Sequence, residues 1–511
     1  MPDHFNLTTY FVDRHVEEGR GERTALVTDG EAWSYGRLSG LTNRVGNALR
    51  ELGVKPEQRV LLALSDGPEF VAAWYGAIKI GAVTTEAYTY LQTKDYAYYL
   101  GYTQAVVAIV DATTLERFRE IPGRTARLLV VGVPADRLRE DELSFDVLVS
   151  AAPDSLDPAP THRDSIALWK FTTGSTGRPK ACVHRMVTPL LSFRSYAQGV
   201  LEISPDDLVL PVPKLFFGYA RDLAALFPFG VGAAGIVFPE RTTPELIFEL
   251  IERHRPTILV QVPTMMRAML DLPGARDRDL SCLRLCTSAG EALPRELYDE
   301  WREAFGVEVL DGIGSSEAYH IFISNRPGDV VPGSAGLAVP GYEAQIVDDD
   351  GCALPDGEVG HLWIRGETTA LMYWEDRAAS VDTFAGDVVM SGDLFVRDDD
   401  GFFTFEGRAD ELIKVSGVWV APLEVERALL EHPDVAECAV IGIQQMGLTV
   451  TCAHVVTRSG VEGSDELGLA LQRFARDRLS AHKYPRLVRF VDELPKTGSG
   501  KLDRRALSGG R

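Results

Sequence analysis

Paired cysteines are absent from this sequence. Its six cysteines are scattered through 511 residues without C-x-x-C spacing, at Cys182, Cys282, Cys286, Cys352, Cys438 and Cys452. This pattern excludes a disulfide scaffold and a zinc site of the usual spacing, and it favours a reducing cytoplasm. The N-terminal stretch MPDHFNLTTYFVDRHVEEG lacks the apolar core of a signal peptide, so we expect no export.

Basic residues and long uncharged runs are also scarce. The chain has 52 Lys and Arg against 74 Asp and Glu, a formal net charge of −22. Such a charge repels nucleic acid and anionic membrane surfaces. The least charged run, LAALFPFGVGAAGIVFP from Leu223 to Pro239, holds two prolines and three glycines. It therefore predicts a buried strand with turns rather than a membrane span.

What is present is enough apolar material, at 45% hydrophobic residues, for more than one core. A chain of 511 residues exceeds what one core usually supports, so we expect at least two domains. Apolar residues at helical spacing between Leu38 and Leu52 precede the strand-like run RVLLAL at 59–64. The same alternation recurs in PELIFELIERH before TILVQV, LPRELYDEWREAF before VEVL and PLEVERALLEH before VAECAVIGI. This predicts an α/β fold with mostly buried sheets.

The clearest domain boundary lies in DGFFTFEGRADELIKVSG, where a strand-like stretch gives way to charged residues and a new series of short elements. We predict a domain over 1–409 and a compact smaller domain over 410–511.

The segment TTGSTGRPK, at 172–180, combines glycines, hydroxyls and a lysine after a strand-like run. Glycines let the backbone approach an anion, hydroxyls donate to it, and Lys180 supplies a charge, so the segment suits a polyphosphate. It differs from the common P-loop, because Arg-Pro stands between the second glycine and the lysine. A purely structural Gly/Ser turn is the alternative. The candidate anion-binding residues are Thr172, Thr173, Gly174, Ser175, Thr176, Gly177 and Lys180.

Two further segments follow strand-like runs. SAGEALP begins at Ser288, and DGIGSSE runs from Asp311 to Glu317. Open α/β sheets bind ligands at the carboxyl ends of their strands. Glu317 is suited to hold Mg²⁺ through oxygen, and a solvated or helix-capping carboxylate is the alternative.

The C-terminal part carries more charged residues beside glycine. Asp393 in SGD can accept from ribose hydroxyls, and Arg408 in GRAD can donate to them. Lys501 ends PKTGSGK, a flexible loop that would reach a developing negative charge if the small domain closed. A solvated tail is the alternative for this loop.

Together, TTGSTGRPK, SSE, SGD, GRADELIK and PKTGSGK resemble the signature set of the adenylate-forming superfamily of acyl-CoA synthetases, peptide-synthetase adenylation domains and luciferases. KLFFGYA, CTSAGEALPRE, LDGIGSSEAYHIFISNR, VSGVWVAPLEVE and HKYPR resemble its benzoate-CoA ligase branch. The resemblance implies a large domain of helix-flanked β-sheets with a small β-barrel subdomain, followed by a mobile α+β domain. It also implies an acid that is adenylated with ATP and Mg²⁺ and then transferred to coenzyme A.

The resemblance further assigns roles to residues. The 172–180 segment would hold the β- and γ-phosphates, and Ser316 and Glu317 would attend the α-phosphate and Mg²⁺. Lys501 would bridge the acid carboxylate and the α-phosphate, two anions that otherwise repel each other. Asp393 and Arg408 would grip the ribose. The adenine site would be lined by Gly290, Glu291, Ala292, Asp311, Gly312 and Ile313.

The remaining implied roles concern the acid and the acceptor. The small domain would pivot at Asp410 and bring the segment around Gly417 to the pantetheine tunnel. The acid pocket would be formed by Phe216, Phe217, Gly218, Tyr219, Ala289, Gly290, Gly314, His320 and Ile321. For His320, ordinary packing is the alternative.

Two departures from the branch bear on substrates. Ala-Arg-Asp-Leu at 220–223 stands where the branch usually has Gly-Leu-Gly-Asn, which suggests an acid that is substituted, larger than benzoate or differently oriented. The segment 446–454 lacks the basic residues that often precede this strand, so CoA's phosphates would lose partners. A carrier-protein pantetheine is the alternative acceptor. A monomer or homodimer is expected.

A regulator that binds a nucleotide or acyl-CoA without catalysis is a further alternative. Glu317, Lys180 and Lys501 are all present, and a binding module would need none of these charges in this arrangement.

Overall fold

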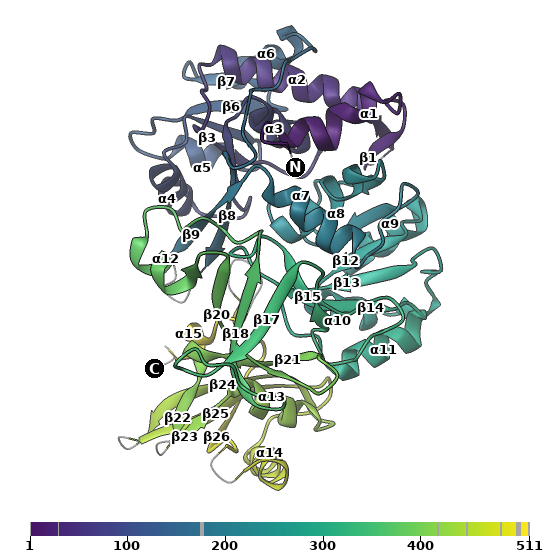
Figure 1. The fold of residues 1–511 in the computed structure, drawn as a ribbon. Coiled ribbons are helices and arrows are strands. Elements are labelled where there is room, and N and C mark those ends of the chain that lie inside the picture. The colour runs from purple at the N-terminus through teal and green to yellow at the C-terminus, as the bar shows by residue number, and fades with distance from the viewer. Residues whose placement is uncertain are drawn as a thin grey trace. The chain divides into compact units, whose positions relative to one another are not determined.

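The computed structural model describes residues 2–28, 30–173, 178–415, 418–445, 448–480, 483–496 and 502–508. The chain forms two compact units (Figure 1). Unit 1 is Met1–Ala344 with Ile364–Met390, and unit 2 is Gln345–Trp363 with Ser391–Arg511. This division differs from the predicted boundary at Asp410, which stays a prediction.

One sheet of unit 1, seven-stranded in the described residues, has the order β7-β6-β5-β3-β4-β8-β9. Neighbouring strands are parallel except β8 and β9, which form an antiparallel pair. The strands are β3 (Arg59–Ala63), β4 (Val83–Glu86), β5 (Val107–Asp111), β6 (Arg127–Val131), β7 (Glu142–Ser144), β8 (Ile166–Thr173) and β9 (Pro179–Arg185).

Helices connect these strands, as the alternating pattern predicts. The predicted helix over 38–52 is α2 (Tyr35–Glu51), and the Ser34 hydroxyl caps it by accepting from the Arg37 amide at 3.2 Å. The predicted strand at 59–64 is β3. The other helices of this region are α1 (Arg14–Glu17), α3 (Pro68–Lys79), α4 (Thr93–Thr103), α5 (Leu115–Arg119) and α6 (Phe145–Ala151).

The other large sheet of unit 1, nine-stranded in the described residues, has the order β16-β15-β14-β13-β12-β10-β11-β1-β2. Every residue of β12 and β13 is buried, in agreement with the predicted buried sheets. The strands are β1 (Thr24–Thr28), β2 (Glu31–Ser34), β10 (Leu208–Pro211), β11 (Ala234–Ile236), β12 (Ile258–Gln261), β13 (Leu285–Ser288), β14 (Val309–Gly314), β15 (Ile321–Ser324) and β16 (Leu337–Ala338).

The helices beside this sheet include one that the sequence did not predict. The run 223–239 begins in helix α8 (Gly218–Ala225), and only β11 within it is a strand, so the prediction of a strand with turns was wrong for its first part. A Cβ on Gly235 would lie 1.8 Å from the Ala224 carbonyl oxygen, so the glycine lets α8 pack directly on β11. The other helices are α7 (Thr188–Ser192), α9 (Pro244–His254), α10 (Pro263–Leu270) and α11 (Arg295–Phe305).

Strands β17 (Tyr342–Val347), β18 (Val359–Gly366) and β20 (Val388–Arg397) each belong partly to both units. In unit 1, β20 pairs with β19 (Phe384–Ala385), and α12 (Arg377–Thr383) precedes β19. In unit 2, β20 pairs with β21 (Phe403–Arg408).

The C-terminal part of unit 2 is α+β, as predicted. Its strands are β22 (Ile413–Val415), β23 (Val418–Val420), β24 (Val435–Gln445), β25 (Leu448–Thr457) and β26 (Leu487–Phe490). Its helices are α13 (Pro422–Leu430), α14 (Asp465–Arg478) and α15 (Arg504–Ser508). In neither unit is any described helix long and apolar enough to span a bilayer.

Candidate active site

The candidate site of unit 1 lies where the β8–β9 pair meets the ends of β13 and β14. Ser288 at the end of β13 pairs with Asp311 on β14, so Ala289 and Gly290 leave the sheet beside Gly312–Gly314. The Ser316 hydroxyl donates to the Phe171 carbonyl of β8 at 3.3 Å. Both sheets thus contribute to one region, and the predicted motifs do follow the carboxyl ends of parallel strands.

The candidate phosphate-binding segment begins and ends on this antiparallel pair. Thr172 and Thr173 end β8, and Thr172 lies opposite Lys180 of β9. The Lys180 ammonium is 3.6 Å from the Asp376 carboxylate and 5.1 Å from the centre of the Tyr373 ring. Gly174, Ser175, Thr176 and Gly177 lie outside the described residues.

Glu317 is held by unit 1 itself. The Tyr373 hydroxyl donates to Glu317 Oε1 at 2.6 Å, and the Ala370 amide donates to the Glu317 carbonyl at 2.8 Å. Tyr373 lies 56 residues after Glu317 in the chain and belongs to none of the predicted motifs, so it was not predicted from the sequence.

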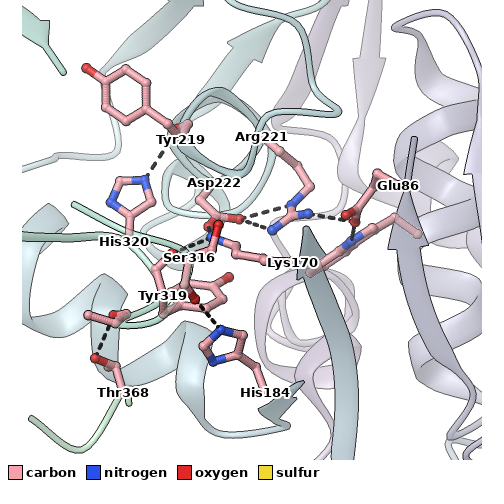
Figure 2. Close-up of polar contacts among 12 residues, drawn as sticks. Glu86, Lys170, His184, Tyr219, Arg221, Asp222, Ser316, Tyr319, His320 and Thr368 are labelled. Atoms are coloured by element: carbon pink, nitrogen blue, oxygen red, sulfur yellow. Dashed lines mark hydrogen bonds and ion pairs between the residues drawn. The ribbon is translucent and has the colours of Figure 1, made fainter. Parts of the chain in front are cut away.

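Side chains, rather than a neighbouring strand, satisfy three carbonyls of the segment between β14 and β15 (Figure 2). His184 Nε2 donates to Ser316 at 2.7 Å, Thr368 Oγ1 to Ala318 at 2.9 Å and Lys170 Nζ to Tyr319 at 2.6 Å. A carbonyl only accepts, so Nε2 of His184 carries its proton. None of these three donors was predicted. For Lys170 there was a signal, because a lysine inside the buried run SIALWKF must have a partner.

The Lys170 ammonium belongs to a buried group of four charges, Glu86, Lys170, Arg221 and Asp222, each at most 6% exposed. Lys170 is 2.7 Å from Asp222, which Arg221 contacts at 2.9 Å, and Arg221 reaches Glu86 at 2.6 Å. The Trp74 indole also donates to Glu86, at 2.6 Å. The charge pair at 221–222 therefore contacts other buried charges, and the expectation that the acid is substituted, larger than benzoate or differently oriented stays a prediction.

Burial and mutual attraction act in opposite directions on these groups. Burial lowers the pKa of Lys170 to about 8, although Asp222 opposes the change. Burial alone would raise the pKa of Asp222, but Arg221 and Lys170 outweigh it and hold this pKa at about 2. Burial raises the pKa of Glu86 despite Arg221. At neutral pH Lys170 and Asp222 are therefore a charged pair.

The predicted acid-pocket residues come from three segments that lie together in unit 1. Phe216 and Phe217 precede α8, Gly218 and Tyr219 open it, and His320 precedes β15. The Tyr219 hydroxyl lies 2.7 Å from Thr287 Oγ1, and His320 Nε2 lies 3.3 Å from the Tyr219 carbonyl. Burial lowers the pKa of His320 to about 3, so its ring is neutral. Ile321 is the first residue of β15, Gly314 is the last residue of β14, and Ala289 directly follows β13.

The residues assigned to adenine lie on β14 and in the segment after β13. Glu291 accepts from the Thr264 hydroxyl at 2.7 Å, and Gly290 has φ +91°, which a side chain would strain. Burial raises the pKa of Asp311 to about 7. Ala292 follows Glu291, and Gly312 and Ile313 continue β14.

The residues assigned to the ribose belong to unit 2. Asp393 and Arg408 are opposite each other on β20 and β21, and their side chains are 3.1 Å apart. Arg408 also contacts Asp410, the predicted hinge, at 3.1 Å. Gly417 and Lys501 lie outside the described residues.

Comparison with known families matches these motifs to two family models. The model described as AMP-binding enzyme matches residues 12–374, and the AMP-binding enzyme C-terminal domain matches residues 424–501. The chain belongs to the AMP-binding enzyme family.

Relatives within the family are similar along nearly the whole chain. The benzoate–CoA ligase of Thauera aromatica is 38% identical over 99% of this chain and 96% of its own length. A crystal structure of the anthranilate CoA ligase AuaEII with anthranoyl-AMP has a TM-score of 0.93 and 37% identity, and covers 99% of this chain and 97% of that one. A benzoate CoA ligase from Burkholderia xenovorans LB400 has a TM-score of 0.90 and 38% identity, with 98% and 99% covered. The resemblance to the benzoate-CoA ligase branch and the predicted fold class are confirmed.

Proposed function

We propose that this chain is an AMP-forming aryl-carboxylate–CoA ligase. The observation that carries the proposal is the meeting of two motifs in unit 1. The strand pair that bears Thr172 and Lys180 touches the segment that bears Ser316 and Glu317. Full-length similarity to benzoate– and anthranilate–CoA ligases supports an aromatic acid as substrate.

In the proposed first half-reaction, an oxygen of the acid carboxylate attacks the α-phosphorus of ATP, and pyrophosphate leaves. The 172–180 segment would bind the β- and γ-phosphates through backbone amides, hydroxyls and the Lys180 ammonium. Lys501 would approach the α-phosphate from the C-terminal domain and offset the repulsion between the two reacting anions. After this step the group that leaves the acyl carbon is AMP, which leaves far more readily than oxide would.

Mg²⁺ would neutralise phosphate charge during this step. The described residues contain no cluster of three or more His, Cys, Asp or Glu suited to a metal. That fits an ion held by one carboxylate with phosphates and waters, which is how Mg²⁺ is usually bound beside a nucleotide. Glu317 is the proposed protein ligand, because its Oε1 is oriented by the Tyr373 hydroxyl.

In the proposed second half-reaction, a thiolate attacks the acyl carbon and AMP leaves. We infer that the C-terminal domain turns at Asp410 between the two steps and brings the segment around Gly417 to the thiol. Free CoA is the first candidate acceptor, and a carrier-protein pantetheine is the second, because the sequence 446–454 offers no lysine or arginine for CoA's phosphates. A monomer or homodimer in the cytoplasm remains our expectation.

The test is mass spectrometry of reactions that hold the chain, ATP, Mg²⁺, CoA and one carboxylic acid from a panel. The panel spans benzoate, hydroxy- and aminobenzoates, cinnamates, fatty acids and bulky polycyclic acids. We expect acyl-CoA and AMP from one aromatic class. Acyl-adenylate without thioester would favour a carrier-protein acceptor, and no acid-dependent pyrophosphate release would contradict the proposed function.

A further inference from the structure

Lys170 lies between two of the three segments to which the acid pocket is assigned. It is on β8, its side chain is 5% exposed, and its ammonium donates to both Asp222 of α8 and the Tyr319 carbonyl (Figure 2). Its stem runs under the start of α8, where a Cβ on Gly218 would lie 2.7 Å from Lys170 Cε. One side chain thus contacts the residues directly before both Tyr219 and His320.

Tyr319 has a backbone conformation that needs support. Its φ is +76°, a value rare for a residue with a side chain, and it is 1% exposed. The Lys170 ammonium bonds its carbonyl at 2.6 Å and lies 3.6 Å from the centre of its ring, where the negative face of the ring attracts a cation. Lys170 therefore stabilises the conformation that directs the chain from Tyr319 into His320.

These contacts connect Lys170, Tyr319, His320, Tyr219 and Gly218 in a closed series beside the proposed acid site. His320 Nε2 lies 3.3 Å from the Tyr219 carbonyl, and Tyr219 follows the Gly218 that rests on Lys170. Without the ammonium, the Tyr319 carbonyl would lose this side-chain donor, and the orientation of His320, the next residue, would no longer be held. It would leave the His184 bond to Ser316 and the Tyr373 bond to Glu317 in place.

Lys170 keeps its charge because of residues 221–222, where this chain differs from the resembling branch. Asp222 is its counter-ion, and Arg221 and Glu86 are next to Asp222 in the same buried group. A buried lysine without a carboxylate would lose its proton or its place in the interior. Arg221 and Asp222 stand where the resembling branch usually has Leu and Gly, so the charged support belongs to this chain's own version of the site.

We propose that Lys170 is a positioning residue for the acid pocket: it holds Tyr319 and the start of α8 so that Tyr219 and His320 face the acid at a fixed spacing. This proposal rests on the proposed function in one respect only, that the ligand of the pocket is the acid. Lys170 does not itself contact the acid. It determines how tightly the acid is held and how well similar acids are distinguished, and it leaves the nucleotide site unaffected.

The test compares Lys170→Met with the matched control Lys79→Met. Lys79 is also buried, with a side chain 3% exposed, and its ammonium is 2.7 Å from Asp13 and 2.6 Å from Asn43. Both substitutions keep an unbranched stem and leave one carboxylate without its lysine. Both are therefore expected to lower the thermal midpoint, so that a general loss of stability is the same in the two variants.

With the best acid of the panel, we expect Lys170→Met to raise the KM for the acid about tenfold, because Tyr219 and His320 lose the support of a charged hydrogen bond and no longer keep the spacing that binds the acid. It should reduce the kcat/KM preference between the two best acids severalfold, and the KM for ATP should change less than about twofold. Lys79→Met should change none of these values, and Lys170→Arg should restore part of the preference. Equal acid KM values in the two Met variants would overturn the proposal.

A second measurement does not depend on activity. In histidine-labelled protein, the imidazole NMR signals of His320, assigned with His320→Gln, should shift in Lys170→Met and not in Lys79→Met. Unmoved signals in both variants would overturn the positioning role even if the chain turned over no acid. Shifted signals in a chain that releases no pyrophosphate with any acid would instead leave the positioning role standing and contradict the proposed function.

Discussion

At the scale of single residues, the contact between Tyr373 and Glu317 is decisive for the proposed Mg²⁺ site. A carboxylate that must bind a hard cation benefits from an orientation that is set before the ion arrives. The Tyr373 hydroxyl provides this by donating to Glu317 Oε1 at 2.6 Å. Burial raises the pKa of Tyr373, so the phenol keeps its proton at neutral pH and can donate it to the carboxylate.

We predict that Tyr373→Phe raises the Mg²⁺ concentration needed for half-maximal pyrophosphate release about tenfold, because one charge-assisted hydrogen bond is lost. Titration of Mg²⁺ at saturating ATP and acid measures this. Tyr102→Phe is the control, since the Tyr102 hydroxyl donates to the Trp374 carbonyl and not to Glu317. An unchanged Mg²⁺ titration in Tyr373→Phe would exclude the orienting role.

At the scale of elements, β9 supports the catalytic segment through His184. Burial lowers the pKa of this imidazole to about 3, from 6.5 in the unfolded chain. Between these two values the unfolded chain binds a proton that the folded chain does not. The stability contribution is therefore complete above pH 6.5 and is lost as the pH falls, by about 1.4 kcal/mol per pH unit.

His184→Gln isolates this effect, because the Gln amide nitrogen can donate to the Ser316 carbonyl but does not titrate. The unmodified chain should lose about 2 kcal/mol relative to the variant between about pH 6.5 and about pH 4.5. Urea unfolding at several pH values measures the difference in the free energy of unfolding. A difference that does not depend on pH would show that His184 binds its proton over the same pH range in the folded and the unfolded chain, and would contradict the prediction.

Helices and strands with a clear apolar period were predictable as elements. The run PELIFELIERH coincides with α9, and RVLLAL contains β3. The start of the 223–239 run was not predictable, because only its first three residues belong to α8 and less than one helical turn shows no period. The residues of α8 from Ala220 on are also all buried, so no polar face reveals the helix.

At the scale of the whole molecule, the two proposed half-reactions require two arrangements of the C-terminal domain. Asp410 lies in a short turn after β21 and accepts from Arg408. We predict that Asp410→Pro, which fixes φ at this position, leaves acid-dependent pyrophosphate release within about twofold and slows acyl-CoA formation at least about tenfold.

The two rates can be separated in one protein preparation, by pyrophosphate release without CoA and by conversion of supplied acyl-adenylate with CoA. Asp410→Ala is the control, because it removes the carboxylate but keeps the backbone free. If Asp410→Ala slowed the second step as much as Asp410→Pro did, the Arg408 contact rather than hinge freedom would explain the loss.

The fold class, the family and the order of the candidate motifs could be predicted from the amino-acid sequence alone. The glycines, hydroxyls and charges of each motif lie within a few consecutive residues, so their spacing can be recognised without the fold. The side chains that contact these motifs could be identified only in the folded chain. Lys170 and Asp222, or Glu317 and Tyr373, are more than fifty residues apart, and only the packing of elements distant in the sequence brings such pairs into contact. A charged residue in a buried run can be recognised in a sequence, but its counter-ion cannot. A buried charge is stable only where an opposite charge lies within hydrogen-bonding distance, and the fold determines which residue that is.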